Sequence, residues 1–109
     1  MKKYQYPSVL TIAGFDGGGG AGIQADIKTI SALGCYATSV LTALPVQNTQ
    51  GVKNIFPIPI KAVAEQLETV MEDIVPNAIK IGMVHTRNWL MLLCKHCKNI
   101  VKFLSCSIL

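Results

Sequence analysis

A short apolar run, four consecutive glycines and a helical pattern follow one another near the start of the chain. Residues 8–13, SVLTIA, are short, β-branched and mostly apolar, which is typical of a strand buried on both faces. Residues 21–33 carry isoleucine or leucine at helical spacing, and Gly34 follows as a helix stop. A buried strand that leads into a helix predicts a parallel sheet, because parallel neighbours need a crossover connection.

The next segments extend this pattern. Residues 37–44 predict a second buried strand that ends at Pro45, and residues 47–51, QNTQG, predict a polar loop. Residues 52–59 contain two prolines, which favour an extended edge or flap over a central strand.

The alternation continues with the clearest helix of the chain. Residues 60–74 place apolar side chains on one face and three glutamates off it, and residues 78–84 predict a third buried strand. Strands that alternate with helices predict an α/β fold, with a parallel sheet covered by helices on both faces.

The net charge of +4 does not indicate a nucleic-acid partner. Through residue 85 the lysines balance the acids, and the excess is confined to Arg87, Lys95, Lys98 and Lys102. A nucleic-acid-binding domain spreads its positive charge over a folded face, and aromatic residues for base stacking make up only 6% of this chain. We therefore expect no nucleic acid as a partner.

We also expect no membrane association and a cytoplasmic location. No apolar run approaches the roughly 18 residues that a membrane-spanning helix needs. Residues 1–16 do not form a secretory signal, because their apolar run is short and ends at Asp16 and the glycines. The four cysteines are expected to be free thiols in a reducing compartment.

The glycine stretch allows several interpretations. Residues 17–22 satisfy the dinucleotide-binding pattern G-x-G-x-x-G, but the acid that should follow about 20 residues later is absent between Asp26 and Glu65. A P-loop is excluded because no Lys-Ser or Lys-Thr follows the glycines. The remaining interpretations are a tight turn and a ligand held close to the helix N-terminus. In the second, Asp26 would orient a substrate hydroxyl; otherwise it is a solvated helix residue.

Longer segments carry a more specific signal. The segments LTIAG, GAGIQADIKTISALG, TALPVQNTQGV and KIGMV resemble, in order and spacing, the hydroxymethylpyrimidine/phosphomethylpyrimidine kinases of thiamine biosynthesis. The resemblance runs over residues 9–86 and implies a three-layer ribokinase-like fold. It implies phosphoryl transfer from ATP, with Mg²⁺, to 4-amino-5-hydroxymethyl-2-methylpyrimidine and then to its monophosphate. It further implies a homodimer for the full-length protein.

The resemblance also implies substrate-binding residues. The residues matching Gly14 and Asp26 hold the substrate hydroxyl, and Gln47 reads the pyrimidine ring through its amide. The backbone of Pro45 contacts the pyrimidine, and Met83 lines the pocket. These positions lie at or just past the carboxyl ends of the predicted strands, where ligands of parallel sheets bind. No metal-ligating residue is implied.

Three departures from the family pattern lie close to this site. Phe15 stands where the family usually has Ser or Thr, and we expect its ring to crowd the pocket. Gly17 and Gly18 replace a Pro-Ser or Ser-Ser pair, which raises the entropy lost when the loop becomes ordered. Pro45 is also unusual, but it keeps the carbonyl that the contact needs.

Residues 87–109 have a different character, with no acid, no glycine and three cysteines. We interpret residues 1–86 as the N-terminal part of a ribokinase-like kinase domain. Residues 87–109 are then an atypical tail, and translation in a wrong reading frame is our hypothesis for it. A basic amphipathic membrane helix is a less favoured alternative. So is a zinc site, because its Cys-x-x-Cys pair lacks a second pair; its ligands would be His85, Cys94, His96, Cys97 and Cys106.

In the family, the later half of the chain carries the anion hole, the catalytic base and most of the ATP pocket. We therefore assign no catalytic residue here and expect this chain to be inactive alone. A non-catalytic pyrimidine-binding remnant is the alternative function.

Overall fold

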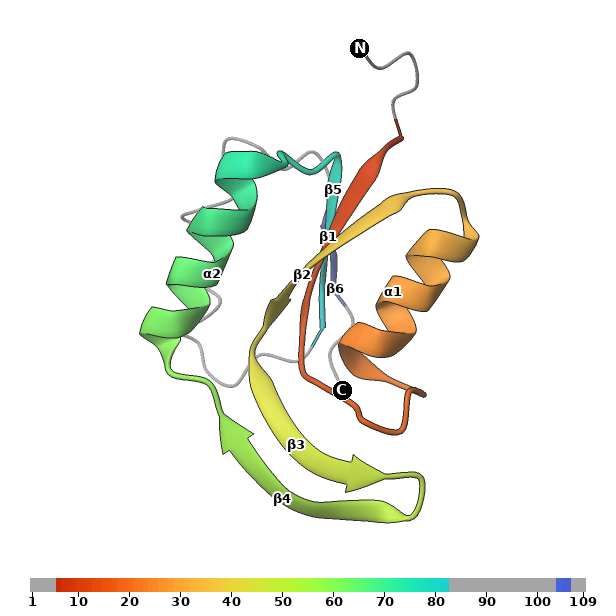
Figure 1. Cartoon of the computed structure of the whole chain (residues 1–109), viewed down its shortest axis with the longest axis vertical. Helices are drawn as coiled ribbons and strands as arrows, with labels where there is room; N and C mark the ends of the chain where they lie inside the picture. The colour runs from red at the N-terminus through yellow and green to blue at the C-terminus, as the bar shows by residue number, and fades with distance from the viewer. Residues whose placement is uncertain (1–5, 83–103, 107–109) are drawn as a thin grey trace.

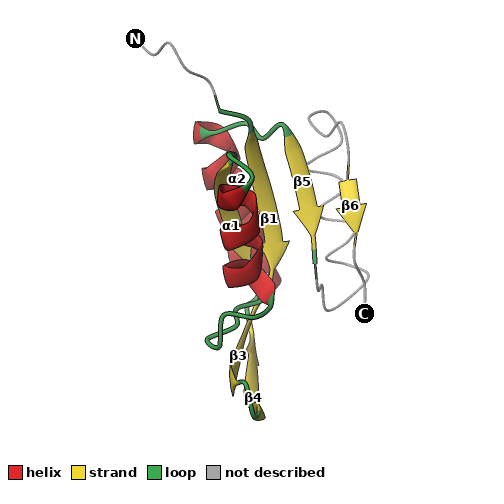
Figure 2. Ribbon diagram, turned by 90° about the vertical axis from the view of Figure 1, so that its right-hand side faces the viewer, coloured by secondary structure: helices red, strands yellow, loops and turns green. Residues whose placement is uncertain are grey.

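The computed structural model describes residues 6–82 and the backbone of residues 104–106 (Figure 1). Its main sheet holds β1 (Ser8–Ala13), β2 (Tyr36–Leu41), β5 (Ala78–Ile81) and β6 (Leu104–Cys106). The strand order is β2-β1-β5-β6, and each neighbouring pair is parallel. Figure 2 shows β1, β5 and β6 running in the same direction. The predicted parallel sheet is confirmed, although β6 was not predicted.

The two helices cover opposite faces of the sheet. In Figure 1, α1 (Gly22–Ala32) and α2 (Ile60–Asp73) lie on either side of the central strands. Leu10 and Ile12 of β1 belong to the buried core that Val63 and Leu67 of α2 complete. Because alternate residues of a strand point to opposite faces, Thr11 faces α1 instead. The three-layer arrangement is therefore confirmed.

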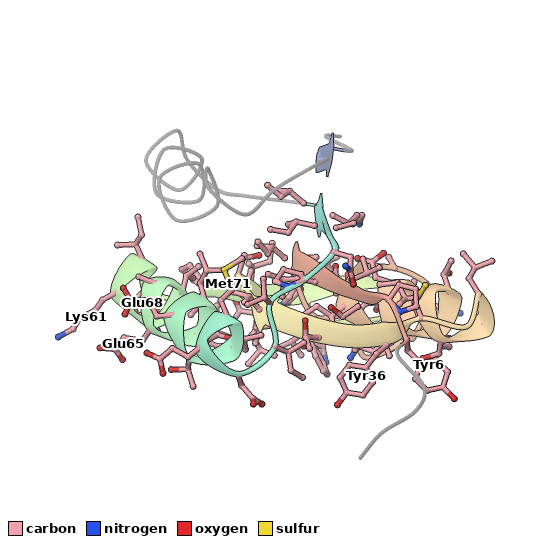
Figure 3. All side chains as sticks on the ribbon, turned by 90° about the horizontal axis from the view of Figure 1, so that it is seen from above. Tyr6, Tyr36, Lys61, Glu65, Glu68 and Met71 are labelled. Atoms are coloured by element: carbon pink, nitrogen blue, oxygen red, sulfur yellow. The ribbon has the colours of Figure 1, made fainter. Side chains whose placement is uncertain are left out.

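The local pattern of α2 explains its position. Its apolar stripe packs on the sheet, with Met71 partly buried against the core. Figure 3 shows Lys61, Glu65 and Glu68 on the side of α2 away from the sheet. The predicted bounds of both helices differ from the observed ones by one residue at most at each end. The predicted third strand, residues 78–84, is observed as β5, which ends earlier than predicted, at Ile81 before Gly82; residues 83 and 84 lie outside the described residues.

The prediction of one strand over residues 37–44, ended by Pro45, is wrong. β2 ends at Leu41, and β3 (Ala43–Asn48) continues through Pro45 and pairs antiparallel with β4 (Gly51–Pro57). Proline is tolerated there because each strand of a two-stranded hairpin has one unpaired edge, where a missing N–H breaks no ladder bond. The predicted flap over residues 52–59 is confirmed as β4, and the polar loop is shorter than predicted.

The hairpin of β3 and β4 extends beyond the carboxyl ends of the parallel strands (Figure 1). Its surface is unusually apolar for a projecting element. Five large hydrophobic side chains are each more than a third exposed: Leu44, Val46, Val52, Ile55 and Phe56. Exposed apolar side chains gathered on one element are typical of a surface that binds another molecule.

The connection from β1 to α1 depends on a very close approach of two backbone segments. The N–H of Ile23 donates to the carbonyl oxygen of Gly14 at 2.8 Å. Gly22 has a φ of +62°, and a Cβ atom at this position would lie 2.3 Å from the same oxygen. Only glycine fits this turn, so the tight-turn interpretation of the glycine stretch holds at Gly22.

Replacing Gly22 by alanine therefore tests how the helix is seated. We expect Gly22→Ala to lower the free energy of unfolding by at least about 1–2 kcal/mol. This is the cost of holding a residue with a Cβ atom in the left-handed conformation of this position, before any clash is counted. Gly20 is the matched control, because no atom lies within 4 Å of its added Cβ and its φ is not in the left-handed region. Urea denaturation followed by circular dichroism measures both variants. Equal stability of the two variants would contradict the required close approach.

Candidate functional site

A cavity of about 410 Å³ lies at the carboxyl ends of the parallel strands. Its wall combines the end of β1, the residues that lead into α1, the first turns of α1, the hairpin, Lys80 and Gly82. Ligand-binding pockets of proteins commonly have volumes of roughly 300–1,000 Å³. The cavity therefore has room for a small organic molecule, in the place where parallel sheets bind their ligands.

Four of the five predicted site residues line this one cavity: Gly14, Asp26, Pro45 and Gln47. Met83 lies outside the described residues. Gln47 was expected just past a strand end but lies inside β3, beside an irregularity in the pairing with β4. The structure therefore brings residues from β1, α1 and the hairpin together, and their roles toward a ligand remain a prediction.

Asp26 is held by two neighbouring strands. Its Oδ2 atom accepts a hydrogen bond from the Thr11 hydroxyl at 2.5 Å and from the Lys80 ammonium at 2.9 Å. Thr11 and Lys80 are direct partners in the β1–β5 register. The Asp26 side chain is 17% exposed, so it is not the solvated helix residue of the alternative interpretation. Among the described residues nothing donates to its Oδ1 atom, which leaves that oxygen as an acceptor.

Asp16 closes the loop between Gly14 and Gly22. Its carboxylate accepts hydrogen bonds from three backbone N–H groups, those of Gly18, Gly20 and Ala21, at 2.9, 3.1 and 2.8 Å. These donors belong to the loop that precedes α1 and to its N-cap, Ala21. The Asp16 carboxylate therefore fixes the shape of the loop from within.

Phe15 and Gln47 complete the wall next to the loop. The Gln47 amide nitrogen donates to the carbonyl oxygen of Phe15 at 3.3 Å, which ties the hairpin to the loop. The Phe15 ring also lines the cavity, with its Cε2 atom 3.5 Å from where a Cβ of residue 17 would lie. Phe15 therefore lies on the wall of the cavity, next to the glycine loop.

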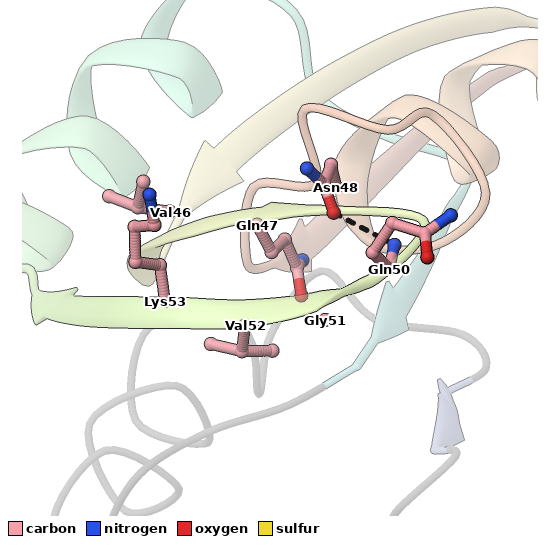
Figure 4. A pocket seen from close by; sticks show the side chains of 7 residues that line it. All are labelled: Val46, Gln47, Asn48, Gln50, Gly51, Val52 and Lys53. Atoms are coloured by element: carbon pink, nitrogen blue, oxygen red, sulfur yellow. Dashed lines mark hydrogen bonds between the residues drawn. The ribbon is translucent and has the colours of Figure 1, made fainter.

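A second cavity, of about 430 Å³, lies along the hairpin alone (Figure 4). Its wall comes from residues 46–48 and 50–53, and the Asn48 side chain accepts a hydrogen bond from the Gln50 N–H across the turn. Its lining contains no carboxylate and comes from β3, β4 and the turn between them. We assign no function to it.

Sequence reasoning missed Thr11 and Lys80. A lysine in the middle of a buried strand, AIKI, indicates a partner of opposite charge, because lysine is almost never buried unpaired. The partner was not evident, since Asp26 lies 54 positions away in the chain.

The alternative sites lie elsewhere in the chain. Within residues 6–82 no group of three or more His, Cys, Asp or Glu side chains is placed to hold a metal ion. The zinc alternative, with His85, Cys94, His96, Cys97 and Cys106, involves no side chain that the structure describes. Neither of the described helices is long and apolar enough to cross a bilayer, and the amphipathic alternative within residues 87–109 falls outside the description.

Comparison with known proteins extends the match seen in the sequence. A hydroxymethylpyrimidine/phosphomethylpyrimidine kinase of Escherichia coli is 54% identical over 77 residues, which cover 71% of this chain and 29% of the relative. The crystal structure of a phosphomethylpyrimidine kinase from Clostridium difficile superposes with a TM-score of 0.85 at 45% identity. That match covers 93% of this chain and 44% of the other.

A pyridoxal kinase from Staphylococcus aureus in complex with pyridoxal is also similar, with a TM-score of 0.86 at 32% identity. It covers 95% of this chain and 39% of that one. This chain spans less than a third of the length of the curated relatives it matches. The family model for phosphomethylpyrimidine kinase matches residues 16–103, and so extends past residue 86, where the resemblance of the sequence motifs ends. The chain belongs to the phosphomethylpyrimidine kinase family, within the ribokinase-like kinases.

Proposed function

We propose that this chain forms the acceptor-binding part of a kinase that phosphorylates 4-amino-5-hydroxymethyl-2-methylpyrimidine and then its monophosphate. One observation carries the proposal. Residues that the family uses for the pyrimidine come from three separate elements, and they line a single cavity of suitable volume. In a protein with an unrelated fold, we would not expect Gly14, Asp26 and Gln47 to lie on one wall of a cavity.

The chemistry of the wall suits a neutral aminopyrimidine alcohol. Asp26 offers its Oδ1 atom as an acceptor for the substrate hydroxyl, while Oδ2 is held in place by the protein. The Gln47 amide can both donate to and accept from the edge of the ring. At Gly14 an added Cβ would meet nothing closer than 3.7 Å, so the fold itself does not require glycine there. Close approach of a ligand explains the bare backbone instead.

The described residues do not fit ATP. Its phosphates are stabilised by a cluster of positive groups, and Lys80 is the only cation among the described residues that line the cavity, beside two carboxylates. We propose that ATP and Mg²⁺ are bound by parts of the kinase outside the described residues. For this chain alone the proposal is therefore substrate binding, and a non-catalytic pyrimidine-binding protein remains the alternative.

Calorimetry with the pyrimidine alcohol, without any nucleotide, tests this proposal. We expect the chain to bind it and Asp26→Asn to bind it at least about tenfold more weakly, since hydrogen bonds to a charged group contribute roughly 1.5–3 kcal/mol. Gly14→Ala should also weaken binding while the fold is kept. Asp73→Asn, at an exposed position of α2, is the matched control.

Two results would contradict the proposal. One is the absence of binding by a chain whose circular dichroism shows it to be folded. The other is equal affinity of the Asp26→Asn and Asp73→Asn variants. Tighter binding of pyridoxal than of the pyrimidine would instead indicate the substrate specificity of the similar pyridoxal kinase. Binding of NAD would support the dinucleotide-binding interpretation of the glycine stretch.

We further propose that the protein is a cytoplasmic homodimer joined through the hairpin. The exposed apolar side chains of β3 and β4 support this surface, and the free thiol of Cys35 agrees with a reducing compartment.

Sedimentation equilibrium tests the dimer. We expect Phe56→Asp to give a monomer, because a charge would be buried without a partner in an apolar contact. Val75→Asp is the matched control: Val75 is 61% exposed but lies beyond the amino end of β5, far from the hairpin, so this variant should stay dimeric. A monomeric wild-type chain, or equal effects of the two variants, would refute the interface.

A further inference from the structure

Lys80 is the only cation among the described residues that line the main cavity. The same wall carries two carboxylates, those of Asp16 and Asp26. Asp16 is engaged by three backbone N–H groups, so its position is fixed by the loop. The electrostatic character of the open part of the cavity is therefore decided by the pair of Asp26 and Lys80.

The Lys80 side chain runs from the middle of β5 toward the carboxyl end of the sheet. A Cβ atom at Gly82 would lie 3.2 Å from the Lys80 ammonium nitrogen, so the ammonium sits over Gly82. Gly82 and Asp26 both line the cavity. The Lys80 side chain is 31% exposed, which leaves its charged end accessible to a bound molecule.

The ammonium of Lys80 has N–H donors that form no hydrogen bond to the described residues. A lysine carries three N–H donors, and the only hydrogen bond it makes to a described residue goes to Asp26. The oxygen that it contacts also accepts from Thr11, so Asp26 keeps a partner if the lysine shifts. Lysine has a flexible stem, and a small shift between two anions costs little at a partly exposed site.

We propose that Lys80 admits the phosphorylated form of the substrate to this cavity. Its ammonium bridges Oδ2 of Asp26 and the phosphate of the pyrimidine monophosphate. This inference rests on the proposed function and adds a specificity residue to it. A phosphate ester would otherwise be repelled by the two carboxylates of the wall, and Lys80 is the only cation among the described residues that line it. The neutral alcohol needs no such cation.

The test compares two ligands, the pyrimidine alcohol and its monophosphate, by calorimetry at low and high salt. Lys80→Gln removes the charge but keeps an N–H donor for Asp26. We expect it to weaken binding of the monophosphate at least about tenfold more than it weakens binding of the alcohol, as for a lost charge-assisted bond. Lys80→Arg should keep the monophosphate affinity. Lys53→Gln, on the exposed part of the hairpin, controls for net charge.

Salt gives an independent readout. Monophosphate binding by the wild type should weaken between about 50 and about 300 mM NaCl, and Lys80→Gln should lose most of that dependence. An equal loss for both ligands, or no loss for either, would overturn the role of Lys80. So would a wild-type chain that binds the alcohol but not the monophosphate. A wild-type chain that binds neither ligand would refute the proposed function itself.

Discussion

The contact between the start of α1 and the end of β1 fixes the geometry of the whole site. Because Gly22 has no side chain, the helix begins against the carbonyl oxygen of Gly14, with the Ile23 N–H bonded to it. Asp26 follows one turn later and is thereby placed over Thr11 and Lys80 of the adjacent strands. A side chain at residue 22 would displace the helix, and the carboxylate would lose its two partners together.

The two carboxylates of the cavity, Asp16 and Asp26, differ in their hydrogen-bond partners and therefore in the roles we assign to them. Asp16 accepts hydrogen bonds from backbone N–H groups of its own loop, which is a local arrangement. Asp26 is bound by side chains of two strands at one oxygen only. The first carboxylate therefore shapes the loop, while the second keeps an acceptor for a ligand. A glycine-rich turn before a helix is thus not by itself a phosphate site.

The sequence predicted those helices and strands whose formation depends on the residues of their own segment. β1 and both helices follow from apolar periodicity and a glycine stop, and the resemblance brought Gly14, Asp26, Pro45 and Gln47 to one site. The division between β2 and β3 could not be predicted, because Pro45 becomes acceptable only through the edge position that the hairpin gives it. The Lys80 partnership depends on the β1–β5 register, which no single segment encodes.

The hairpin links binding to assembly in this fold. Val52 and Ile55 line the cavity and are yet about half exposed, at 57% and 50%. In the chain alone, one cavity wall is a two-stranded ribbon, which is at best marginally stable when it stands alone in water. A partner that covers the apolar hairpin would hold this wall in place, with Pro45 and Gln47 on it. Under the proposed dimer, each subunit would preorganise the substrate cavity of the other.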